Sequence, residues 1–470
     1  MIPIATGARV RDAETRWFAA HPGGDLMGGA AAAVVRAAVE MLPRQPSLCQ
    51  VLIAVGPGNN GGDGLFAAAG LAAAGAQVTV WCTSDAVHLA GWSAAAAECR
   101  FVDAIQALEA LPDADLVIDA VLGIGGRPGL PVDVATFAAA VGDCGIDVLA
   151  VDIPSGLDAD SPNRPLPASF TATRTLTFAS AKLAHHAQPA AGRCGVVEVV
   201  DIGIDLGDEG VRVITPADVA RLWPRPNALS DKYSRGVVGV DAGSPAYTGA
   251  AVLATFGAVY SGAGMVRFVG PDEAATLVRQ AMPSVVVGSG QVQAWVCGSG
   301  WGPSVVNGER LAARLADHRP VVVDADALRR LPTDLPSGSL LTPHAGELAW
   351  LLKVERAAVE ADPLGHARRA AARFSASVLL KGATQYAVHP DGSAYLAVAG
   401  PAWTAQAGSG DVVAGICATL LASGVEASLA GGLAASAQAM TALAHPGPWP
   451  ADAIARLLPG VIGSLAAPQA

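Results

Sequence analysis

Short apolar runs separated by helical patterns recur along the first half of the chain. Such alternation indicates βαβ units, whose strands pair in parallel within one sheet and are connected by helices. In an open parallel sheet, ligands bind in the loops that follow the carboxyl ends of the strands. The sequence therefore predicts an α/β fold with its functional residues in those loops. The predicted strands are Val51–Val55, Gln77–Trp81, Leu116–Ile118 and Val148–Val151, and a helix over Leu65–Ala74 is predicted after the first of them.

The chain has 470 residues, which is too many for one ordinary hydrophobic core. The first α/β pattern ends after Val199–Gly203, and a helix start at Thr215 and a rigid turn at Trp223–Pro226 follow it. A second α/β pattern then begins. We therefore predict two domains, residues 1–212 and 213–470, with the boundary between residues 205 and 220. The predicted strands of the second domain are Val237–Val240, Trp295–Cys297, Val321–Val323 and Val378–Leu380.

Composition excludes several classes of protein. Hydrophobic residues make up 52% of the chain and charged residues 15%, which indicates a compact globular protein and not a disordered one. A formal net charge of −11 argues against a surface for nucleic acid or for an anionic membrane. The longest uncharged stretch, residues 242–266, is interrupted by Gly, Ser, Pro and Thr, so a buried helix with its loops explains it better than a membrane span. We therefore expect no nucleic-acid partner and no membrane partner.

The seven cysteines are scattered and form no CxxC motif. This pattern favours reduced, buried thiols over disulfides or a zinc site. The first sixteen residues lack the basic and then apolar pattern of a signal peptide. We therefore expect a cytoplasmic protein, and we expect it to form a homo-oligomer.

Two Gly-rich segments that contain an aspartate lie more than 300 residues apart, at Gly58–Gly64 and Gly408–Asp411. Each follows an extended apolar stretch and precedes a run of small helix-forming residues. Backbone amides at the start of such a helix bind phosphate, although a single Gly-rich segment is often only a turn. Two such segments without an internal repeat suggest two active sites on one polypeptide.

Polar residues follow several of the predicted strands in the first half. Asn60, Asp119 and Ser155 supply only oxygen ligands, which suit a group I or group II cation far better than zinc. Asp152 directly follows a strand and could transfer a proton, although an aspartate at a strand end is often only a helix cap. Lys182 and a histidine three residues later belong to the same set.

The segments Gly56–Gly64, Asp119–Gly123 and Val151–Asp158 resemble the NAD(P)H-hydrate epimerase domain, and Thr173–Lys182 and Asp201–Ile204 extend the match to about residues 5–210. The resemblance implies a Rossmann-like three-layer α/β/α domain that epimerises hydrated NADH and NADPH at C6 of the nicotinamide ring. It also implies catalysis by Asp152 and a potassium ion held by Asn60, Asp119 and Ser155. The implied substrate contacts are Asn59, Asn60, Gly61, Gly62, Asp63, Gly123, Ile124, Gly125, Gly126, Arg127, Pro128, Gly129 and Asp152.

The second Gly-rich segment has a clear physical role. Its small residues expose amides that form an anion hole with the dipole of the following helix, and Asp411 at the helix start could accept a proton from a hydroxyl that attacks phosphorus. Lys381 follows a predicted strand and could approach a diphosphate, although a surface lysine is the default interpretation. The roles of Asp324 and Asp326 are ambiguous: one could contact a metal or a water near the phosphates, and the other could cap a helix.

The segments Thr342–Glu347 and Ala407–Asp411 resemble the ribokinase-like NAD(P)H-hydrate dehydratase, and the resemblance covers about residues 215–465. It implies a ribokinase-like α/β/α domain in which ADP, with magnesium, phosphorylates the C6 hydroxyl of the S hydrate, promoted by Asp411. Elimination then restores NADH or NADPH, and AMP and phosphate are released. The implied substrate contacts are Ala251, Gly300, Gly302, His344 and Asp411, and the implied ADP contacts are Lys381, Gly382, Ala383, Thr384, Gln385 and Gly410.

Three departures from the two families are visible. Gly28 and Gly29 stand where the epimerase domain has a longer turn with Glu and Arg. Trp301 replaces the usual leucine of the dehydratase and is expected to place an indole beside the substrate loop, and Gly400–Thr404 also differs. The last two could shift nucleotide preference. In the leading interpretation, a bifunctional repair enzyme, the partners are the two hydrates, NADHX and NADPHX, and ADP. The alternative interpretation is a vitamin or sugar kinase with a nucleotide-sensing N-terminal binding module.

Overall fold

The computed structural model describes residues 1–207, 210–332 and 334–465. The chain divides into two compact units, one of residues 3–209 and one of residues 210–470 together with residues 1–2. The predicted boundary region between residues 205 and 220 includes two residues outside the described ranges, and the last five residues of the predicted second domain also lie outside them.

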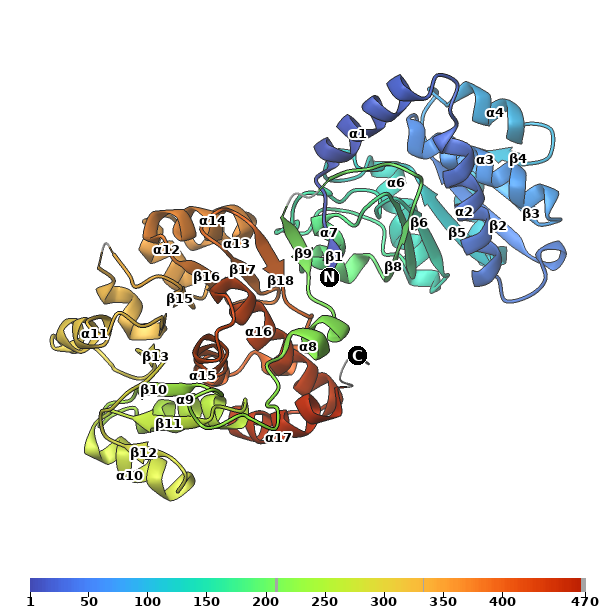
Figure 1. Cartoon of the computed structure of the whole chain (residues 1–470). Helices are drawn as coiled ribbons and strands as arrows, with labels where there is room; N and C mark the ends of the chain where they lie inside the picture. Colours follow the sequence, from blue (N-terminus) through green and yellow to red (C-terminus); the bar gives the residue numbers. More distant parts are fainter. Residues whose placement is uncertain (208–209, 333, 466–470) are drawn as a thin grey trace. The chain divides into compact units, whose positions relative to one another are not determined.

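The first unit contains a seven-stranded sheet in the order β4-β3-β2-β5-β6-β7-β8, and all its neighbouring strands are parallel (Figure 1). The four strands predicted for this half are confirmed as β2, β3, β5 and β6. The order reverses between β2 and β5, which is the point where open parallel sheets hold ligands. The strands are β2 (Gln50–Val55), β3 (Gln77–Cys82), β4 (Arg100–Val102), β5 (Leu116–Ala120), β6 (Val148–Val151), β7 (Arg174–Phe178) and β8 (Val196–Val200).

Helices cover both faces of this sheet. Val51, Ile53 and Val55 of β2 pack in one core cluster with α2 and α3, whereas Leu52 and Ala54 pack in another with α5 and α6. This alternation is the two-residue period of a strand that is buried on both sides, and it produces a three-layer α/β/α arrangement. The helices are α1 (Gly7–Ala20), α2 (Leu26–Met41), α3 (Asn59–Ala73), α4 (Leu89–Ala95), α5 (Ala104–Ala110), α6 (Val132–Cys144) and α7 (Leu183–His186).

The first Gly-rich segment is helical and is not the loop that the sequence predicted. Gly58 is the N-cap of α3, which therefore begins six residues before the predicted start at Leu65. The glycines serve close packing: a Cβ atom on Gly61 would lie 1.9 Å from the carbonyl oxygen of Gly56, and one on Gly64 would lie 2.5 Å from the Cβ of Ala120. Glycine weakens a helix on propensity alone, so the sequence pattern placed the start too late.

The second unit is built on an eleven-stranded sheet in the order β1-β9-β18-β17-β16-β15-β14-β13-β10-β11-β12. The strands from β12 to β16 are parallel, β17 is antiparallel to both of its neighbours, and β18 is parallel to β9. The strands predicted for this half are confirmed as β10, β13, β14 and β16. The strands are β1 (Ile2–Pro3), β9 (Val211–Val213), β10 (Val237–Asp241), β11 (Met265–Phe268), β12 (Val286–Val287), β13 (Ala294–Cys297), β14 (Val321–Val323), β15 (Leu340–Leu341), β16 (Ser377–Leu380), β17 (Tyr386–Val388) and β18 (Ala394–Leu396).

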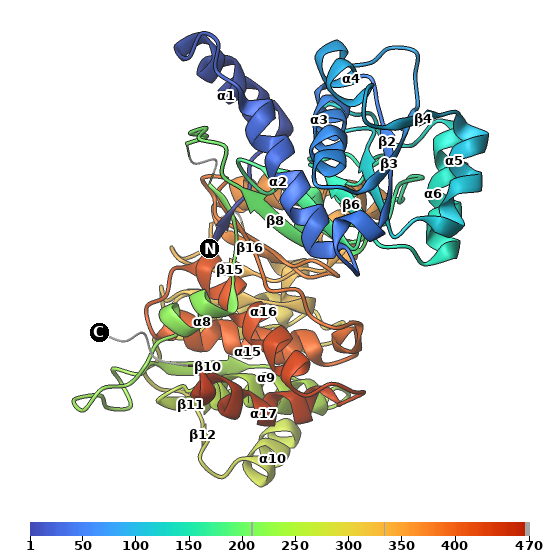
Figure 2. The ribbon, with the colours of Figure 1, turned by 90° about the vertical axis from the view of Figure 1, so that its right-hand side faces the viewer.

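Helix α15 packs directly on α9, and the two lie side by side in Figures 1 and 2. A Cβ atom on Gly257 of α9 would lie 2.1 Å from the carbonyl oxygen of Val412, and one on Gly415 of α15 would lie 2.1 Å from that of Ala254. Only glycine therefore permits this approach, which places the start of α15 at the carboxyl edge of the sheet. The helices are α8 (Pro216–Leu222), α9 (Thr248–Tyr260), α10 (Asp272–Ala281), α11 (Asn307–Leu315), α12 (Ala345–Leu352), α13 (Arg356–Ala361), α14 (Pro363–Phe374), α15 (Ser409–Ala422), α16 (Ala427–Ala444) and α17 (Ala451–Ser464).

The uncharged stretch at residues 242–266 contains α9 and the start of β11, as predicted. Among the described residues, no helix is both long enough and apolar enough to cross a membrane. Thr215 is the N-cap of helix α8, at the predicted helix start. The hydroxyl of Thr215 accepts the Asp218 amide proton while the Asp218 carboxylate accepts the Thr215 amide proton.

Candidate active sites

Asp152 follows β6 in an unusual backbone conformation. Its φ is +69°, and the amide of Ile153 donates across it to the carbonyl of Val151 at 2.9 Å. A hydrogen bond from residue i+2 to residue i around a positive φ defines the rare and strained form of the γ-turn. Such strain persists only where the surrounding contacts hold it, and it is concentrated at functional sites.

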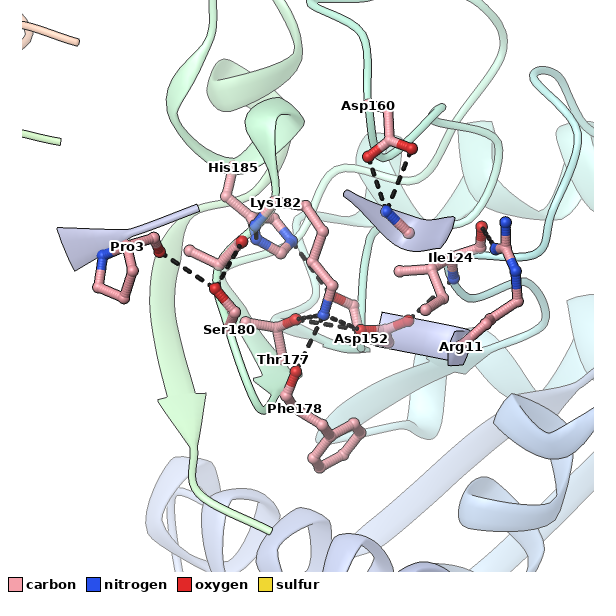
Figure 3. Close-up of polar contacts among 12 residues, drawn as sticks. Pro3, Arg11, Ile124, Asp152, Asp160, Thr177, Phe178, Ser180, Lys182 and His185 are labelled. Atoms are coloured by element: carbon pink, nitrogen blue, oxygen red, sulfur yellow. Dashed lines mark hydrogen bonds and ion pairs between the residues drawn. The ribbon is translucent and has the colours of Figure 1, made fainter. Parts of the chain in front are cut away.

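Three groups bind the Asp152 carboxylate (Figure 3). Its Oδ2 accepts the Ile124 amide at 2.9 Å, and its Oδ1 accepts the Thr177 hydroxyl at 3.0 Å and the Lys182 ammonium at 2.9 Å. The Lys182 side chain is buried, and its Nζ also donates to the Thr177 hydroxyl at 2.6 Å and to the carbonyl of Phe178 at 3.1 Å. All three protons of the ammonium group are thus used.

These contacts keep Asp152 ionised. Burial raises the pKa of its carboxyl, but the charge and hydrogen bond of Lys182 and the Ile124 amide lower it further than burial raises it, so the pKa lies below the ordinary value. Gly123 lies close against Oδ2, because a Cβ atom on Gly123 would lie 2.9 Å from it and 3.2 Å from the Oδ1 of Asn60. The structure therefore brings Asn60, Gly123 and Asp152 together, as the sequence predicted.

Asp119 and Ser155 form a second buried group beside this one. The Asp119 carboxylate accepts the amide of Ser155 at 2.7 Å and also its hydroxyl, and that hydroxyl accepts the amide of Leu122 at 2.7 Å. Burial raises the pKa of Asp119 to about 6, although the bonds from Ser155 lower it. The amide nitrogen of Asn60 is buried without a hydrogen-bond partner. Most of the polar atoms in this group are oxygens, and oxygen atoms are the ligands that alkali and alkaline-earth cations prefer.

Asp63 and Glu14 add carboxyl groups that face Asp152. Asp63 lies in the first turns of α3, and burial together with the charges of Asp152, Glu14 and Asp25 raises its pKa to about 8. Burial and the charge of Asp152 also raise the pKa of Glu14, which lies on α1. Asp63 is therefore protonated at neutral pH and can donate a hydrogen bond, whereas Asp152 can only accept one.

Helix α1 is the part of this site that sequence reasoning missed. The guanidinium of Arg11 donates to the carbonyl of Ile124 at 3.1 Å, and the amide of Gly7 donates to both oxygens of Asp160, at 2.9 and 3.1 Å. Both contacts appear in Figure 3. No motif marks α1, and Thr177 lies in a strand that also contains Arg174 and Thr175, so its sequence carried no clear signal.

The remaining predicted epimerase contacts lie around these side chains. Asn59 and the glycines of the first motif form the first turns of α3, whose amides lack a side-chain cap. The segment after Gly123 runs along the surface, where Gly125, Arg127 and Pro128 are exposed, and the amide of Gly129 donates to the carbonyl of Gly156 at 2.8 Å.

In the second unit, Asp411 lies in the first turn of α15, after the N-cap Gly408 whose φ is +85°. Burial and the charge of Asp324 raise the pKa of the Asp411 carboxyl to about 7, although Lys381 and the hydroxyl of Ser299 lower it. Asp411 therefore titrates near neutral pH, as a general base should. The helix start and the aspartate lie where the sequence predicted them.

Asp324 connects the ends of several strands. Its Oδ1 accepts the Thr342 hydroxyl at 2.8 Å and the Lys381 ammonium at 2.7 Å, and its Oδ2 accepts the Ser299 hydroxyl at 2.8 Å. Burial lowers the pKa of Lys381, but the charges of Asp324, Glu347 and Asp411 and the hydrogen bond to Asp324 together raise it by more, so Lys381 stays charged. Asp326 instead accepts the amide of Gly302 at 2.7 Å and so holds the loop of residues 298–302, which is the predicted substrate loop. These contacts give the two aspartates different roles, neither of which is a side-chain helix cap.

The predicted nucleotide and hydrate contacts meet at Lys381. Its amide donates to the carbonyl of Pro343 at 2.8 Å, which joins the segments of Lys381 and His344. Its ammonium lies 3.2 Å from the position of a Cβ atom on Gly410. Gly382 and Ala383 are exposed, and Thr384 and Gln385 complete the turn between β16 and β17.

His344 is both exposed and structural. Its Nδ1 accepts the amides of Gly346 at 3.0 Å and Glu347 at 3.2 Å, so it caps α12, while 59% of its side chain remains exposed. Gly300 and Gly302 have φ values of +66° and +70°. Ala251 is fully buried in α9, so its side chain offers no surface to a ligand.

Trp301 lies beneath the substrate loop and not at its surface, contrary to the expectation from sequence. It is 1% exposed, its indole nitrogen donates to the carbonyl of Asp241 at 2.9 Å, and the Arg310 guanidinium lies 4.4 Å from the ring centroid. The positive φ values of its two glycine neighbours turn residue 301 inward. Within the described part of the chain, no group of three or more His, Cys, Asp and Glu side chains could hold a metal ion.

Comparison with known proteins agrees with this division into two sites. The family model described as YjeF-related protein N-terminus matches residues 23–184, and the model described as NAD(P)H-hydrate dehydratase matches residues 238–457. A bifunctional NAD(P)H-hydrate repair enzyme Nnr of Mycobacterium leprae is 39% identical over an alignment of 464 positions that covers 94% of each chain. The chain belongs to the bifunctional NAD(P)H-hydrate repair enzyme family.

Other members of this family and two solved structures agree. The Nnr enzyme of Mycobacterium tuberculosis (strain ATCC 25618 / H37Rv) is 40% identical over 88% of each chain. An ADP/ATP-dependent NAD(P)H-hydrate dehydratase of Bacillus subtilis, co-crystallised with ATP and Mg²⁺, covers 54% of this chain and 98% of its own, with a TM-score of 0.50 and 24% identity. A ribokinase-like superfamily protein of Enterococcus faecalis covers 56% of this chain and 99% of its own, with a TM-score of 0.51 and 22% identity. The second unit thus has the ribokinase-like fold, and the kinase alternative is not favoured.

Proposed function

We propose that residues 3–209 epimerise the R and S hydrates of NADH and NADPH at C6, and that residues 210–470 dehydrate the S epimer with ADP. One observation carries this proposal: one site holds the buried Asp152, the other holds the partly buried Asp411, and the pKa values of the two carboxyl groups are shifted in opposite directions. The membership of the chain in the repair enzyme family supplies the substrate class. ADP, the released AMP and phosphate, and magnesium are parts of this proposal.

At the first site, the protein supplies a proton acceptor and a proton donor. Ionised Asp152 offers its Oδ2 beside Gly123, and protonated Asp63 donates. In the proposed sequence, Asp63 protonates the C6 hydroxyl as the C–O bond breaks, and the ring nitrogen stabilises the positive charge. Water then adds from either face and gives its proton to Asp152. The two faces of attack produce the two epimers.

A potassium ion fits the donors present at this site. Asp119, Ser155 and Asn60 offer a carboxylate, a hydroxyl and an amide oxygen, and the buried Asp119 carboxylate has no ion pair among the described residues. A buried carboxylate is costly without a cation, which would explain why burial raises its pKa. When bound, potassium would supply positive charge near the substrate phosphates or hydroxyl.

At the second site, the chain positions the hydroxyl and the phosphate. We infer that the uncapped amides of α15 and the Lys381 ammonium bind the phosphates of ADP, because a helix start and a buried cation both favour an anion. Asp411 then accepts the proton of the C6 hydroxyl as that oxygen attacks the β-phosphorus. This attack releases AMP. The new phosphate then leaves with the C6 oxygen while C5 loses a proton to water, and the C5–C6 double bond that forms restores the nicotinamide ring.

Recovery of reduced nicotinamide tests both activities in one experiment. The purified protein is mixed with both epimers of NADH hydrate, potassium, magnesium and either ADP or ATP, and the absorbance of NADH is followed. We expect full recovery with the wild type, recovery of only the S fraction with Asp152→Asn, and no recovery with Asp411→Asn. No recovery by the wild type with either nucleotide would refute the proposal.

Two further expectations remain predictions. Size-exclusion chromatography with light scattering tests the homo-oligomeric state, and cell fractionation tests the cytoplasmic location.

A further inference from the structure

Two strained turns lie next to each other in the first unit. The γ-turn at Asp152 follows β6, and a second one follows the neighbouring strand β7 at Ala179, where φ is +63° and the amide of Ser180 donates to the carbonyl of Phe178 at 2.7 Å. Non-glycine residues rarely adopt this conformation. Their pairing at adjacent strand ends indicates that specific contacts hold both turns.

The side chain of Lys182 joins the two turns. It donates to the carboxylate of Asp152 in the first turn and to the carbonyl of Phe178 in the second. Lys182 thereby fixes the carboxylate of Asp152, but it does not hold the Asp152 peptide group, on which the γ-turn depends.

His185 binds that peptide group. Its Nδ1 lies 3.1 Å from the amide nitrogen of Lys182, and its Nε2 lies 3.1 Å from the carbonyl oxygen of Asp152 (Figure 3). Because a backbone amide can only donate, Nδ1 is unprotonated, and Nε2 must carry the proton that binds the Asp152 carbonyl. Burial and the Lys182 charge lower the pKa of His185 to about 3, which agrees with a neutral ring of this one tautomer.

We propose that His185 is a positioning residue of the epimerase site, whose Nε2–H holds the strained Asp152 turn and so aims the Asp152 carboxylate at the reacting hydroxyl. The inference rests on the proposed role of Asp152. His185 itself acts through Asp152, since its ring is buried and both of its nitrogens bind the backbone.

A purely structural role makes a different prediction. His185 is also part of a capping box at the start of α7, through the bond from the Lys182 amide to Nδ1. If the cap alone mattered, a substitution that keeps an acceptor at the Nδ1 position would preserve function. If the turn matters, a substitution that keeps a donor at the Nε2 position would preserve it.

Two substitutions separate these roles. His185→Asn places an amide group at the Nδ1 position and loses the bond to Asp152, whereas His185→Gln can place an N–H donor at the Nε2 position. We expect H185N to lower kcat of epimerisation about 100-fold, with KM changed less than about threefold, because the aspartate is misplaced while the substrate contacts remain. We expect H185Q to retain kcat within about tenfold of the wild type. The neighbouring His186→Gln serves as a matched control. Dehydration of pure S hydrate by the same preparations measures the amount of intact chain, and hydrogen-exchange protection of β2 and β5 verifies that the first unit of each variant is folded.

Hydrogen exchange measures the turn without reference to activity. In H185N, the peptides that contain the amides of Ile124 and Ile153 should exchange at least about tenfold faster than in the wild type, and in H185Q they should not. Unchanged exchange in H185N, or an equal loss of kcat in H185Q and H185N, would overturn the inference. A wild type without epimerase activity would instead refute the proposed function, and exchange alone would then decide the role of His185.

Discussion

Asp324→Asn tests the electrostatic basis of the second site. The substitution keeps the size of the side chain and removes one negative charge. The Asp324 carboxylate lies at the centre of the site, where it accepts hydrogen bonds from Ser299, Thr342 and Lys381. Its charge is also one of the two main reasons why the pKa of Asp411 is raised to about 7, the other being burial.

The size of the effect follows from the distance between the two carboxyl groups. The Ser299 hydroxyl lies 2.8 Å from the Asp324 carboxylate and also bonds Asp411, so the two carboxyl groups are within about 6 Å of each other. At that distance and an effective dielectric constant of about 20, the repulsion is about 3 kcal/mol, which corresponds to about two pKa units. The Lys381 ammonium, released from Asp324, would lower the Asp411 pKa further. Burial would still hold it above the ordinary 3.8, so we expect a pKa of roughly 5.

The assay is the pH dependence of kcat for dehydration of pure S hydrate with saturating ADP. Because Asp411 must be ionised to act as a base, the wild-type rate should rise with pH around 7. In D324N the rise should move to lower pH by one to two units, about 1.4 to 2.8 kcal/mol in proton affinity. Glu347→Gln is the matched control, since Glu347 contributes the smallest of the effects on Asp411 and a glutamine can keep the cap. A rise that stays at the wild-type pH, or moves to higher pH, would refute the reasoning.

Three further predictions concern stability and the cation. Asp411→Asn should abolish dehydration, and it should raise the melting temperature by more at pH 8 than at pH 5. The reason is that a carboxyl whose pKa increases on folding from 3.8 to about 7 destabilises the fold as pH rises through that window, by at most about 4 kcal/mol. Ser155→Ala should raise the potassium concentration needed for half-maximal epimerisation by about tenfold or more, since it removes one oxygen and a bond to Asp119; an unchanged potassium titration would contradict this. Gly415→Ala should lower the free energy of unfolding in urea by about 1–3 kcal/mol, because its Cβ would lie 2.1 Å from the Ala254 carbonyl oxygen. Gly460→Ala is the control and should not lower this free energy, because no atom lies within 4 Å of the position of its Cβ.

Eight strands, four in each unit, could be predicted from sequence because most of their residues are buried on both faces. A continuous apolar run such as Val148–Val151 has few other folded environments, and the structure confirms it as β6. The start of α3 was missed for the opposite reason. Its glycines are unfavourable in a helix taken alone, and the contact of Gly61 with the Gly56 carbonyl, which requires them, exists only in the folded sheet.

The candidate sites were predictable to the extent that motifs mark strand ends. Asp152 and Asp411 were placed correctly at the end of β6 and the start of α15. Their pKa values were not predictable, because they depend on neighbours that come from other strands, such as Lys182 and Asp324. The inward direction of Trp301 was also hidden, since it follows from the φ values of its neighbours and not from its own chemistry.

The two sites need opposite protonation states of their aspartates, and this restricts the pH at which they act together. Asp63 must be protonated to donate, so the first site should lose activity as pH rises through about 8. Asp411 must be ionised to accept a proton, so the second site should lose activity as pH falls through about 7. Below this window the epimers would keep interconverting while the S form is not consumed, and above it the S form would be consumed without being replenished from R. The rate of epimerisation divided by the rate of dehydration should therefore fall steadily with rising pH in the wild type. Asp324→Asn should shift the pH dependence of dehydration but not that of epimerisation, because the residues that set the pKa of Asp411 all belong to the second unit.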